Sequence, residues 1–205
     1  MVKITGVGAI ACAVLFASNA FAASGDMPGD MMVRVRAVEL DFNNSSSPLA
    51  GITTNNKTIP EVDVSYFFTS HIATELILTY PQRVGVNLSG TDIGSVKALP
   101  PTLTAQYHFM PDSPSFRPYV GAGINYTHFS NVSLNAGGTP LNVSRSSWGG
   151  ALQAGFDVPL TGNMTFNLDV KKLYMKADVS TAGGTYLSTL KLNPVLIGAG
   201  LGWKF

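Results

Sequence analysis

A histidine and a serine two positions apart, His128 and Ser130, are the residues in this sequence best suited to catalysis. On an extended strand both side chains point to one face, where the imidazole could activate the hydroxyl for hydrolysis. Such a pair also needs an acid that orients the histidine. All three glutamates lie within the first 75 residues, and we expect Asp157 at the far end of the following strand. The sequence therefore predicts no catalytic residues and no enzyme.

No metal or cofactor site is expected either. His71 and His108 have no carboxylate or thiol nearby at the spacing that metal ligands require. Gly121 and Gly123 lack the third glycine and the following helix of a dinucleotide-binding loop. The single cysteine, Cys12, falls in a segment that we expect to be removed, so the mature chain has no thiol chemistry.

The N-terminal residues follow the pattern of a secretory signal peptide. Lys3 supplies the positive charge, residues 4–16 form the apolar core, and residues 20–22 (Ala-Phe-Ala) form a small-x-small cleavage site. We expect a signal peptide over residues 1–22 and one mature domain over residues 23–205. Export without disulfide bonds is typical of a bacterial envelope protein.

The composition excludes several other classes of protein. Apolar side chains make up 45% of the chain and charged ones only 12%, about half the charged fraction of soluble domains. A formal net charge of +1 argues against a nucleic-acid partner, which requires a basic surface. The chain also has no apolar run of about 20 residues, so it is not expected to span a membrane with helices.

The mature chain instead alternates between apolar and polar residues with a period of two, the pattern of β-strands. The odd positions over residues 99–109 are apolar, whereas the even positions from 102 to 108 are polar. The same alternation predicts eight strands in all. They cover residues 33–42, 61–68, 72–80, 99–109, 117–129, 147–158, 165–171 and 195–205.

The connections between these strands alternate in length. Long polar stretches, expected as loops, occupy residues 43–59, 81–97, 130–146 and 177–189, and the short connections are residues 70–71, 110–116 and 159–163. Alternating loop lengths and strands of about ten residues are typical of transmembrane barrels, whereas soluble β-sandwiches have shorter strands. We therefore predict an all-β protein, an eight-stranded antiparallel up-and-down transmembrane β-barrel. Aromatic residues near the strand ends fit membrane girdles, and the terminal Phe205 resembles an assembly signal for the barrel-insertion machinery.

The inward face of the predicted barrel carries charges of both signs. An eight-stranded barrel has an interior that side chains fill, and an unpaired charge there would cost several kcal/mol. The large residues of the early strands oppose glycines of the later ones, so we expect an interlocking plug that blocks a water pore. The predicted lumen plug consists of Arg34, Arg36, Glu61, Asp63, Glu75, Asp169 and Lys171.

Two adjacent prolines, Pro100 and Pro101, mark a candidate opening in the barrel wall. Proline cannot donate a ladder hydrogen bond, so this pair interrupts strand pairing near the outer rim. An alternative is that the prolines only start a strand and have no role in transport. Apolar residues of the long stretches could line an entry site or form a loop cap: Leu49, Ile52, Val84, Val86, Leu88, Ile93, Leu134 and Leu141.

Several motifs together resemble the OmpW family of small outer-membrane proteins. They are LPPTL at 99–103, FRPYVGAGINYT at 116–127, LDVKKLYM at 168–175, LNPVLIGAGLGWKF at 192–205 and VRVRAV at 33–38, whereas the long stretches give no recognisable match. The resemblance implies a narrow barrel in the cell outer membrane that facilitates passage of small hydrophobic molecules. In that family picture the solute enters a hydrophobic outer gallery and leaves sideways through the wall into the lipid.

The implied partners are outer-membrane lipid, the barrel-insertion machinery and a small hydrophobic solute, with no nucleic acid. The alternative function is a non-transporting surface barrel that serves as an adhesin, a receptor or an envelope stabiliser.

Overall fold

The computed structural model describes residues 25–47, 52–54, 57–181 and 183–205, and the side chains of residues 42–56 are not part of that description. The expected signal peptide, residues 1–22, lies outside the described residues. Regular structure in the described part consists of thirteen β-strands. The described residues contain no helix with the length and apolar character needed to cross a membrane.

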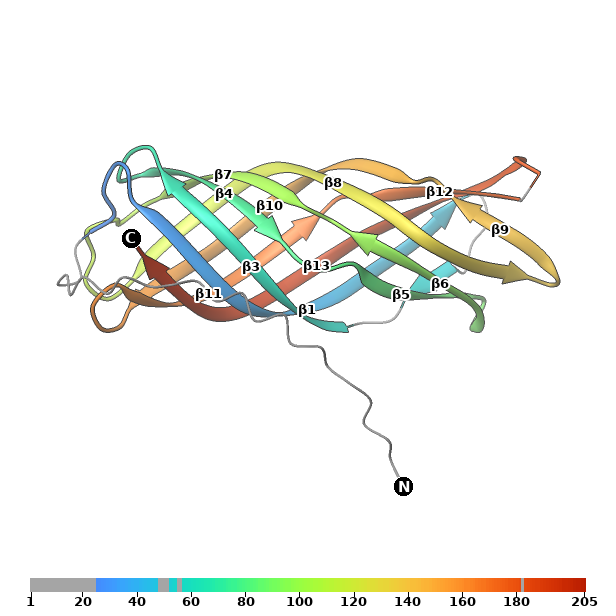
Figure 1. Ribbon diagram of the computed structural model, residues 1–205, viewed down its shortest axis with the longest axis horizontal. Coiled ribbons are helices and arrows are strands. Elements are labelled where there is room, and N and C mark those ends of the chain that lie inside the picture. The colour runs from blue at the N-terminus through green and yellow to red at the C-terminus, as the bar shows by residue number, and fades with distance from the viewer. Residues whose placement is uncertain (1–24, 48–51, 55–56, 182) are drawn as a thin grey trace, which may run out of the picture.

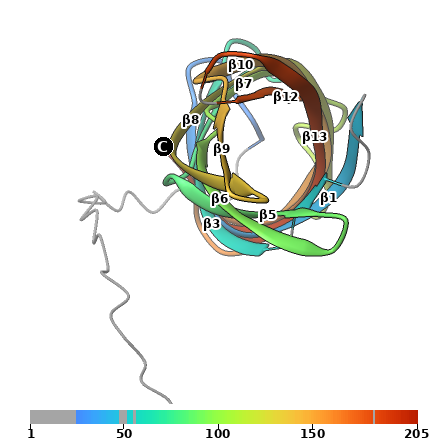
Figure 2. The same cartoon turned by 90° about the vertical axis from the view of Figure 1, so that its right-hand side faces the viewer.

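Eight of the strands form a closed antiparallel ring, in which the pairing of β8 with β10 completes the circle (Figures 1 and 2). Closure leaves no sheet edge, so the backbone groups of the ring are paired within the wall, as a membrane interior requires. The predicted eight-stranded barrel is confirmed. Its strands are β1 (Met31–Ser47), β3 (Lys57–Phe67), β4 (Ile72–Leu78), β7 (Thr102–His108), β8 (Arg117–Ala136), β10 (Ser146–Pro159), β11 (Met164–Leu173) and β13 (Tyr186–Lys204).

Five further strands extend the wall beyond one end of the ring, on the right of Figure 1. They are β2 (Ile52–Thr54), β5 (Gln82–Leu88), β6 (Thr91–Leu99), β9 (Thr139–Val143) and β12 (Lys176–Thr181). The expectation that residues 81–97, 130–146 and 177–189 form loops was therefore wrong. Each stretch carries apolar residues at alternate positions, and these residues pack together inside the extension. We call this end of the barrel the extension end and the opposite one the turn end.

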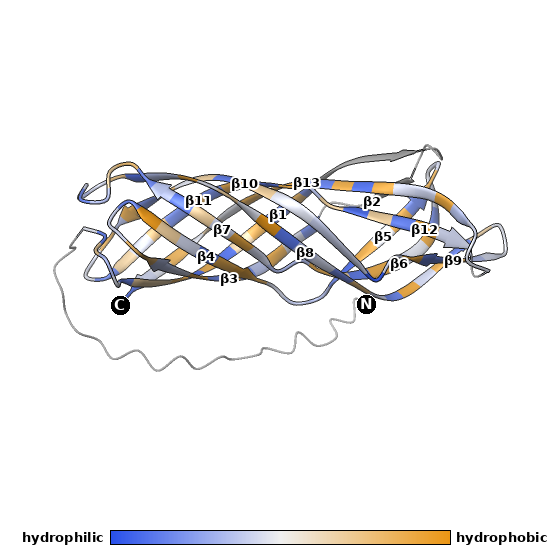
Figure 3. Ribbon diagram, turned by 90° about the horizontal axis from the view of Figure 1, so that it is seen from above, coloured by the Kyte–Doolittle hydropathy of each residue, from blue (hydrophilic) through white to orange (hydrophobic). Residues whose placement is uncertain are grey.

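The faces of the ring are reversed relative to those of a soluble protein. Outward side chains such as Val62, Ile124 and Trp148 are apolar and between 41% and 65% exposed, whereas the inward Arg34 and Asn167 are fully buried. Figure 3 shows the resulting alternation of hydrophilic and hydrophobic residues along the strands. Such a belt of exposed apolar side chains around a polar interior fits a surface in contact with lipid tails.

Aromatic side chains pair on the outer face near both ends of the belt. The ring centroids of Tyr66 and Phe68 lie 5.0 Å apart, and those of Tyr107 and Phe109 lie 5.2 Å apart, at the turn end. Toward the extension end, Trp148 lies 4.9 Å from Tyr126. Aromatic rings at these two levels are typical of the two interfaces of a membrane.

Candidate functional site

Charged side chains from five strands fill the middle of the barrel. The structure brings together all seven residues of the predicted plug and adds Asp157 from β10, and each of the eight is at most 3% exposed. Three cations therefore face five carboxylates, whereas the prediction had four carboxylates. We call this cluster the plug: Arg34, Arg36, Glu61, Asp63, Glu75, Asp157, Asp169 and Lys171.

Two arginines of β1 make the largest number of ion pairs within the plug. Arg34 Nη1 lies 3.2 Å from Asp63 Oδ1, and Arg34 Nη2 lies 2.7 Å from Asp157 Oδ2. Arg36 Nη2 lies 2.7 Å from Asp63 Oδ2 and 3.1 Å from Glu75 Oε1. Removing a partner from buried pairs such as these leaves an uncompensated charge, which is strongly destabilising.

The third cation of the plug, Lys171, connects it to a network of side-chain amides. Its Nζ lies 2.7 Å from Glu61 Oε1 and 2.9 Å from Asp169 Oδ1. Gln153 Nε2 donates to Glu75 Oε2 at 2.7 Å and to Asp169 Oδ2 at 2.8 Å. Glu75 and Asp169 thus receive hydrogen bonds from a neutral donor in addition to their ion pairs, which stabilises buried charge.

Glycines on neighbouring strands, directly across the ladder, make room for bulky residues in the lumen. A Cβ added at Gly155 would lie 2.6 Å from the hydroxyl oxygen of Tyr119, which itself donates to Asp169 Oδ2 at 3.1 Å. A Cβ added at Gly200 would lie 2.8 Å from Arg36 Cγ. Small residues in β10 and β13 therefore permit the close packing that fills the lumen.

A short N-terminal segment, residues 25–30, covers the turn end of the barrel. Asp26 is 2% exposed, its Oδ1 lies 3.0 Å from Arg117 Nη1 and 3.7 Å from Lys204 Nζ, and its Oδ2 lies 3.6 Å from His108 Nδ1. Its backbone N–H donates to the carbonyl of Pro111 at 3.1 Å. Burial raises the pKa of the Asp26 carboxyl to about 6, even though Arg117 and Lys204 act to lower it.

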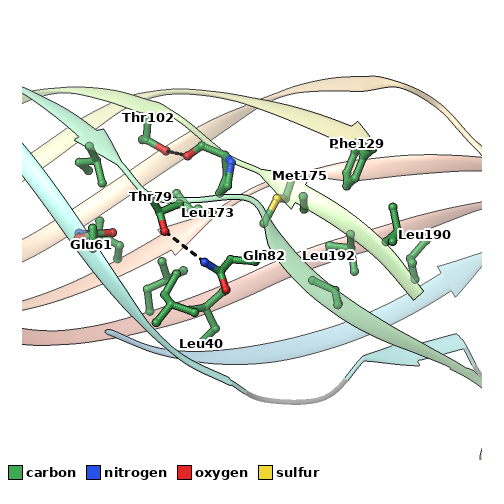
Figure 4. Close-up of a pocket in the computed structure, with 18 of the residues that line it drawn as sticks. Leu40, Glu61, Thr79, Gln82, Thr102, Phe129, Leu173, Met175, Leu190 and Leu192 are labelled. Atoms are coloured by element: carbon green, nitrogen blue, oxygen red, sulfur yellow. Dashed lines mark hydrogen bonds and ion pairs between the residues drawn. The ribbon is translucent and has the colours of Figure 1, made fainter. Parts of the chain in front are cut away.

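Between the plug and the extension end, the lumen is lined almost wholly by apolar side chains (Figure 4). Two small cavities, of about 40 Å³ and 80 Å³, lie along this stretch. They share Val86, Val96, Phe129, Leu190 and Leu192 in their linings, so they adjoin one another. We call the apolar stretch of lumen that they occupy the gallery. Its lining includes Leu40, Ile59, Ile77, Val84, Val86, Leu88, Ile93, Val96, Ala98, Phe129, Leu134, Leu141, Leu173, Met175, Ala177, Val179, Leu190, Leu192 and Leu196.

Six of the eight apolar residues singled out in the long stretches therefore line the gallery. The side chains of Leu49 and Ile52 lie outside the described residues.

The barrel wall is interrupted where the gallery meets the prolines. The β4–β7 ladder ends at Ile77↔Thr102, and the β5–β6 ladder begins at Gln82↔Ala98. In the described structure, residues 78–81 therefore have no ladder partners among residues 99–101.

Proline accounts for this interruption, because Pro81, Pro100 and Pro101 have no backbone N–H to donate. On the other side, Asn125 Nδ2 donates to the carbonyls of Pro100 and Pro101 at 3.3 and 3.2 Å, which ties the prolines to β8. Pro100 also lines the gallery. On the side that faces β4, the prolines therefore have no N–H groups with which to complete the ladder. On the side that faces β8, Asn125 holds them in place.

The remaining residues singled out from the sequence lie at separate places in the barrel. His128 is exposed on the outer face of β8, where it pairs with Leu99 and Ser146, and Asp157 is bound to Arg34 in the plug. Phe205 follows β13, exchanges backbone hydrogen bonds of 2.8 and 3.0 Å with Met31, and is 48% exposed.

Sequence reasoning missed the charged residues at the turn end of the lumen. Asp157 occupies a polar position in the alternation of its strand, so the period of two would have placed it in the lumen. Asp26 precedes the first alternating segment, and no sequence pattern predicts its contact with Arg117.

Comparison with known proteins agrees with this architecture. A sequence model of the OmpW family matches residues 27–205. The uncharacterized outer-membrane protein y4mB of Sinorhizobium fredii is 41% identical over 191 residues, which cover 89% of this chain and 82% of that protein. Outer membrane protein W of Escherichia coli is 33% identical, and the alignment covers 100% of both chains. The crystal structure of OprG from Pseudomonas aeruginosa matches with a TM-score of 0.79 at 27% identity, covering 88% of this chain and 98% of that chain. This chain belongs to the OmpW family of outer-membrane proteins.

Proposed function

We propose that this outer-membrane barrel facilitates the passage of small hydrophobic molecules into the membrane by lateral exit through its wall. The observation that carries the proposal is the gallery, two adjoining apolar cavities that extend from the extension strands to Pro100 at the interruption. An apolar lining binds hydrophobic solutes through the surface that they remove from water. We expect the extension end to face the cell exterior, because long outer connections are typical of such barrels.

The plug supports sideways exit over passage along the whole barrel. Eight buried charged residues, paired with one another, occupy the lumen directly below the gallery, and residues 25–30 cover the turn end. A hydrophobic solute would have to displace these ion pairs to continue downward. The wall beside Pro100 offers a path without broken hydrogen bonds, because its ladder is already interrupted there.

Assembly of the barrel requires delivery to and insertion into the outer membrane. We propose that residues 1–22 direct export and that Phe205 is read by the barrel-insertion machinery. The backbone pairing of Phe205 with Met31, where the first and last strands of the ring meet, supports this proposal.

Uptake of N-phenyl-1-naphthylamine, a hydrophobic dye, tests the transport proposal. The assay uses vesicles whose outer leaflet is lipopolysaccharide, because that leaflet resists hydrophobic solutes. Ala98 is buried in the gallery, whereas Ala122 is exposed on the lipid-facing side of β8. We expect Ala98→Trp to reduce the protein-dependent uptake at least fivefold and Ala122→Trp to leave it unchanged.

A second pair of variants tests the exit. Replacing Pro100 and Pro101 with alanine restores two backbone N–H donors, which can extend the ladder and narrow the interruption. We expect the variant with both prolines replaced to release dye into lipid more slowly. Pro118→Ala, near the start of β8 at the turn end, is the control. If vesicles with and without the protein take up dye equally, transport is excluded, and a non-transporting surface barrel becomes the better description.

A further inference from the structure

One polar atom in the wall of the gallery has no hydrogen-bond partner. Gln82, the first residue of β5, is 3% exposed and lines the gallery beside the interruption at Pro100. Its Oε1 has no donor within hydrogen-bond distance among the described residues. A buried carbonyl oxygen without a donor is strongly disfavoured, so this oxygen calls for a partner that the chain does not supply.

The orientation of the Gln82 amide is fixed by its nitrogen. Nε2 donates to the backbone carbonyl of Tyr80 at 2.9 Å. It also donates to Thr79 Oγ1 at 3.5 Å, the contact drawn in Figure 4. Thr79 Oγ1 in turn donates to the carbonyl of Pro60 at 3.1 Å. Turning the amide over would set two carbonyl oxygens against each other at Tyr80, because neither can donate. The contacts of the nitrogen therefore leave the acceptor oxygen for another group.

The position of this oxygen matters as much as its lack of a partner. The apolar neighbours of Gln82 in the lining are Val84 on β5, Ala98 opposite it in the β5–β6 ladder, and Ile77 on β4. The polar residues of the same lining, Thr79, Thr102, Glu61 and Lys171, have partners within the protein. A second buried oxygen without a partner, Ser188 Oγ, lines the part of the gallery nearer the extension end. A solute moving along the gallery thus meets one oxygen without a partner at Ser188 and another at Gln82, beside the interruption.

We propose that Gln82 Oε1 is a binding site for a hydrogen-bond donor on the passing solute. The class of solute favoured by this site is a hydrophobic molecule with a single hydroxyl or N–H group, such as an aliphatic alcohol or a phenol, over a pure hydrocarbon. A site with a buried acceptor discriminates against an analogue that lacks the donor, because the acceptor is then left unpaired. This inference rests on the proposed transport function, but the binding itself can be measured without transport.

Binding is tested by NMR of the native barrel in lipid nanodiscs with ¹³C-labelled glutamine. The chain contains three glutamines, Gln82, Gln106 and Gln153, and the last two lie in hydrogen bonds at the plug. We expect 1-octanol to shift the side-chain carbonyl resonance of Gln82 downfield and to leave the other two unmoved. Nonane, which has the same number of heavy atoms and no donor, should cause no such shift. No shift with either probe would overturn the site, whether or not the barrel transports.

Transport of the same two probes gives an independent test. Gln82→Met keeps the length of the side chain and removes its oxygen, and Val84→Leu changes the next inward position of β5 without altering polarity. We expect Gln82→Met to reduce the preference for 1-octanol over nonane about three- to tenfold, the effect of losing one neutral hydrogen bond. Val84→Leu should keep the preference, and a heat-resistant band on a gel verifies folding of both variants.

The outcomes separate the site from the transport function. An unchanged preference in Gln82→Met means that a bound water already satisfies the oxygen, and the proposed site is wrong. Failure of both probes to pass through the native barrel overturns the transport function, and the NMR titration then decides the site alone.

Discussion

Neutralising Arg36 should destabilise the barrel more than any change to its outer surface. Arg36 is 1% exposed, and its guanidinium nitrogens lie 3.0 Å from Glu61 Oε1, 2.7 Å from Asp63 Oδ2 and 3.1 Å from Glu75 Oε1. At an effective dielectric constant of about 20, two unit charges about 3 Å apart attract by about 5 kcal/mol. Desolvation of the ions offsets most of that attraction. The expected loss of stability is therefore the cost of leaving three buried carboxylates without the cation that they share, about 3–5 kcal/mol.

The substitution Arg36→Met removes the charge and keeps much of the volume. We expect the free energy of unfolding to fall by about 3–5 kcal/mol. Urea unfolding in lipid or detergent, monitored by the fluorescence of the two tryptophans, measures this change. Lys191→Met, at an exposed position of β13, is the control and should change the free energy of unfolding by less than about 0.5 kcal/mol.

A double variant adds a check on the cause of the loss. Asp63→Asn in the Arg36→Met background removes one of the stranded carboxylates, so it should restore about 1–3 kcal/mol. A loss below about 1 kcal/mol in Arg36→Met alone would refute the reasoning. It would mean that water reaches the carboxylates and that the plug does not seal the lumen.

Three further predictions follow from other contacts. Gly155→Ala places a methyl group 2.6 Å from the Tyr119 hydroxyl and should destabilise the barrel by about 1–3 kcal/mol in urea unfolding. Gly150→Ala, whose added Cβ meets nothing within 3.7 Å, should be neutral, and equal effects of the two would contradict the packing argument. The pKa of the Asp26 carboxyl is raised from 3.8 to about 6 while residues 25–30 are docked on the turn end of the barrel. Asp26 therefore binds a proton more tightly in the docked segment than in the undocked one. The docking of the segment is strongest below about pH 4 and weakens as the pH rises through about 6, by about 100-fold in the opening equilibrium. Hydrogen exchange of the backbone amides of residues 25–30, corrected for its intrinsic pH dependence, measures this equilibrium. Protection that does not change with pH would contradict the raised pKa of Asp26. Phe205→Ala should leave the unfolding free energy nearly unchanged, because the side chain is 48% exposed, while the amount of assembled barrel in cells falls several-fold. Normal assembly of Phe205→Ala would show that Phe205 is not an assembly signal.

The ring and much of the plug could be predicted because a barrel in lipid separates its faces strictly. Every second residue of a strand meets hydrocarbon, so a charged residue such as Arg34 or Lys171 must point inward. The same reasoning applies to Asp157, which the alternation of β10 assigns to the lumen. The partner of each charge was not predictable, because pairing depends on strand tilt and register across the ring.

The extension and the Gln82 site could not be predicted for a different reason. Strands β5, β6, β9 and β12 rise beyond the predicted belt, so their outer faces need not be apolar and the alternation is weaker. Gln82 looks like an ordinary polar residue after a proline in the sequence. The proposed binding role of Gln82 depends on the backbone carbonyl of Tyr80, which accepts a hydrogen bond from the amide nitrogen and so leaves the amide oxygen without a partner.

The seam between β1 and β13 bears on how the barrel is made. Its ladder runs through sixteen residue pairs, from Met32↔Lys204 to Ser47↔Thr189, and joins the two strands that are farthest apart along the chain. Bringing these strands together closes the longest loop of the ring, so we expect this ladder to form last, its hydrogen bonds offsetting the loss of chain entropy. Until that step β1 offers a long unpaired edge. A synthetic peptide that copies residues 195–205 would compete for this edge, and we expect it to trap unfinished barrels during synthesis while leaving completed ones untouched.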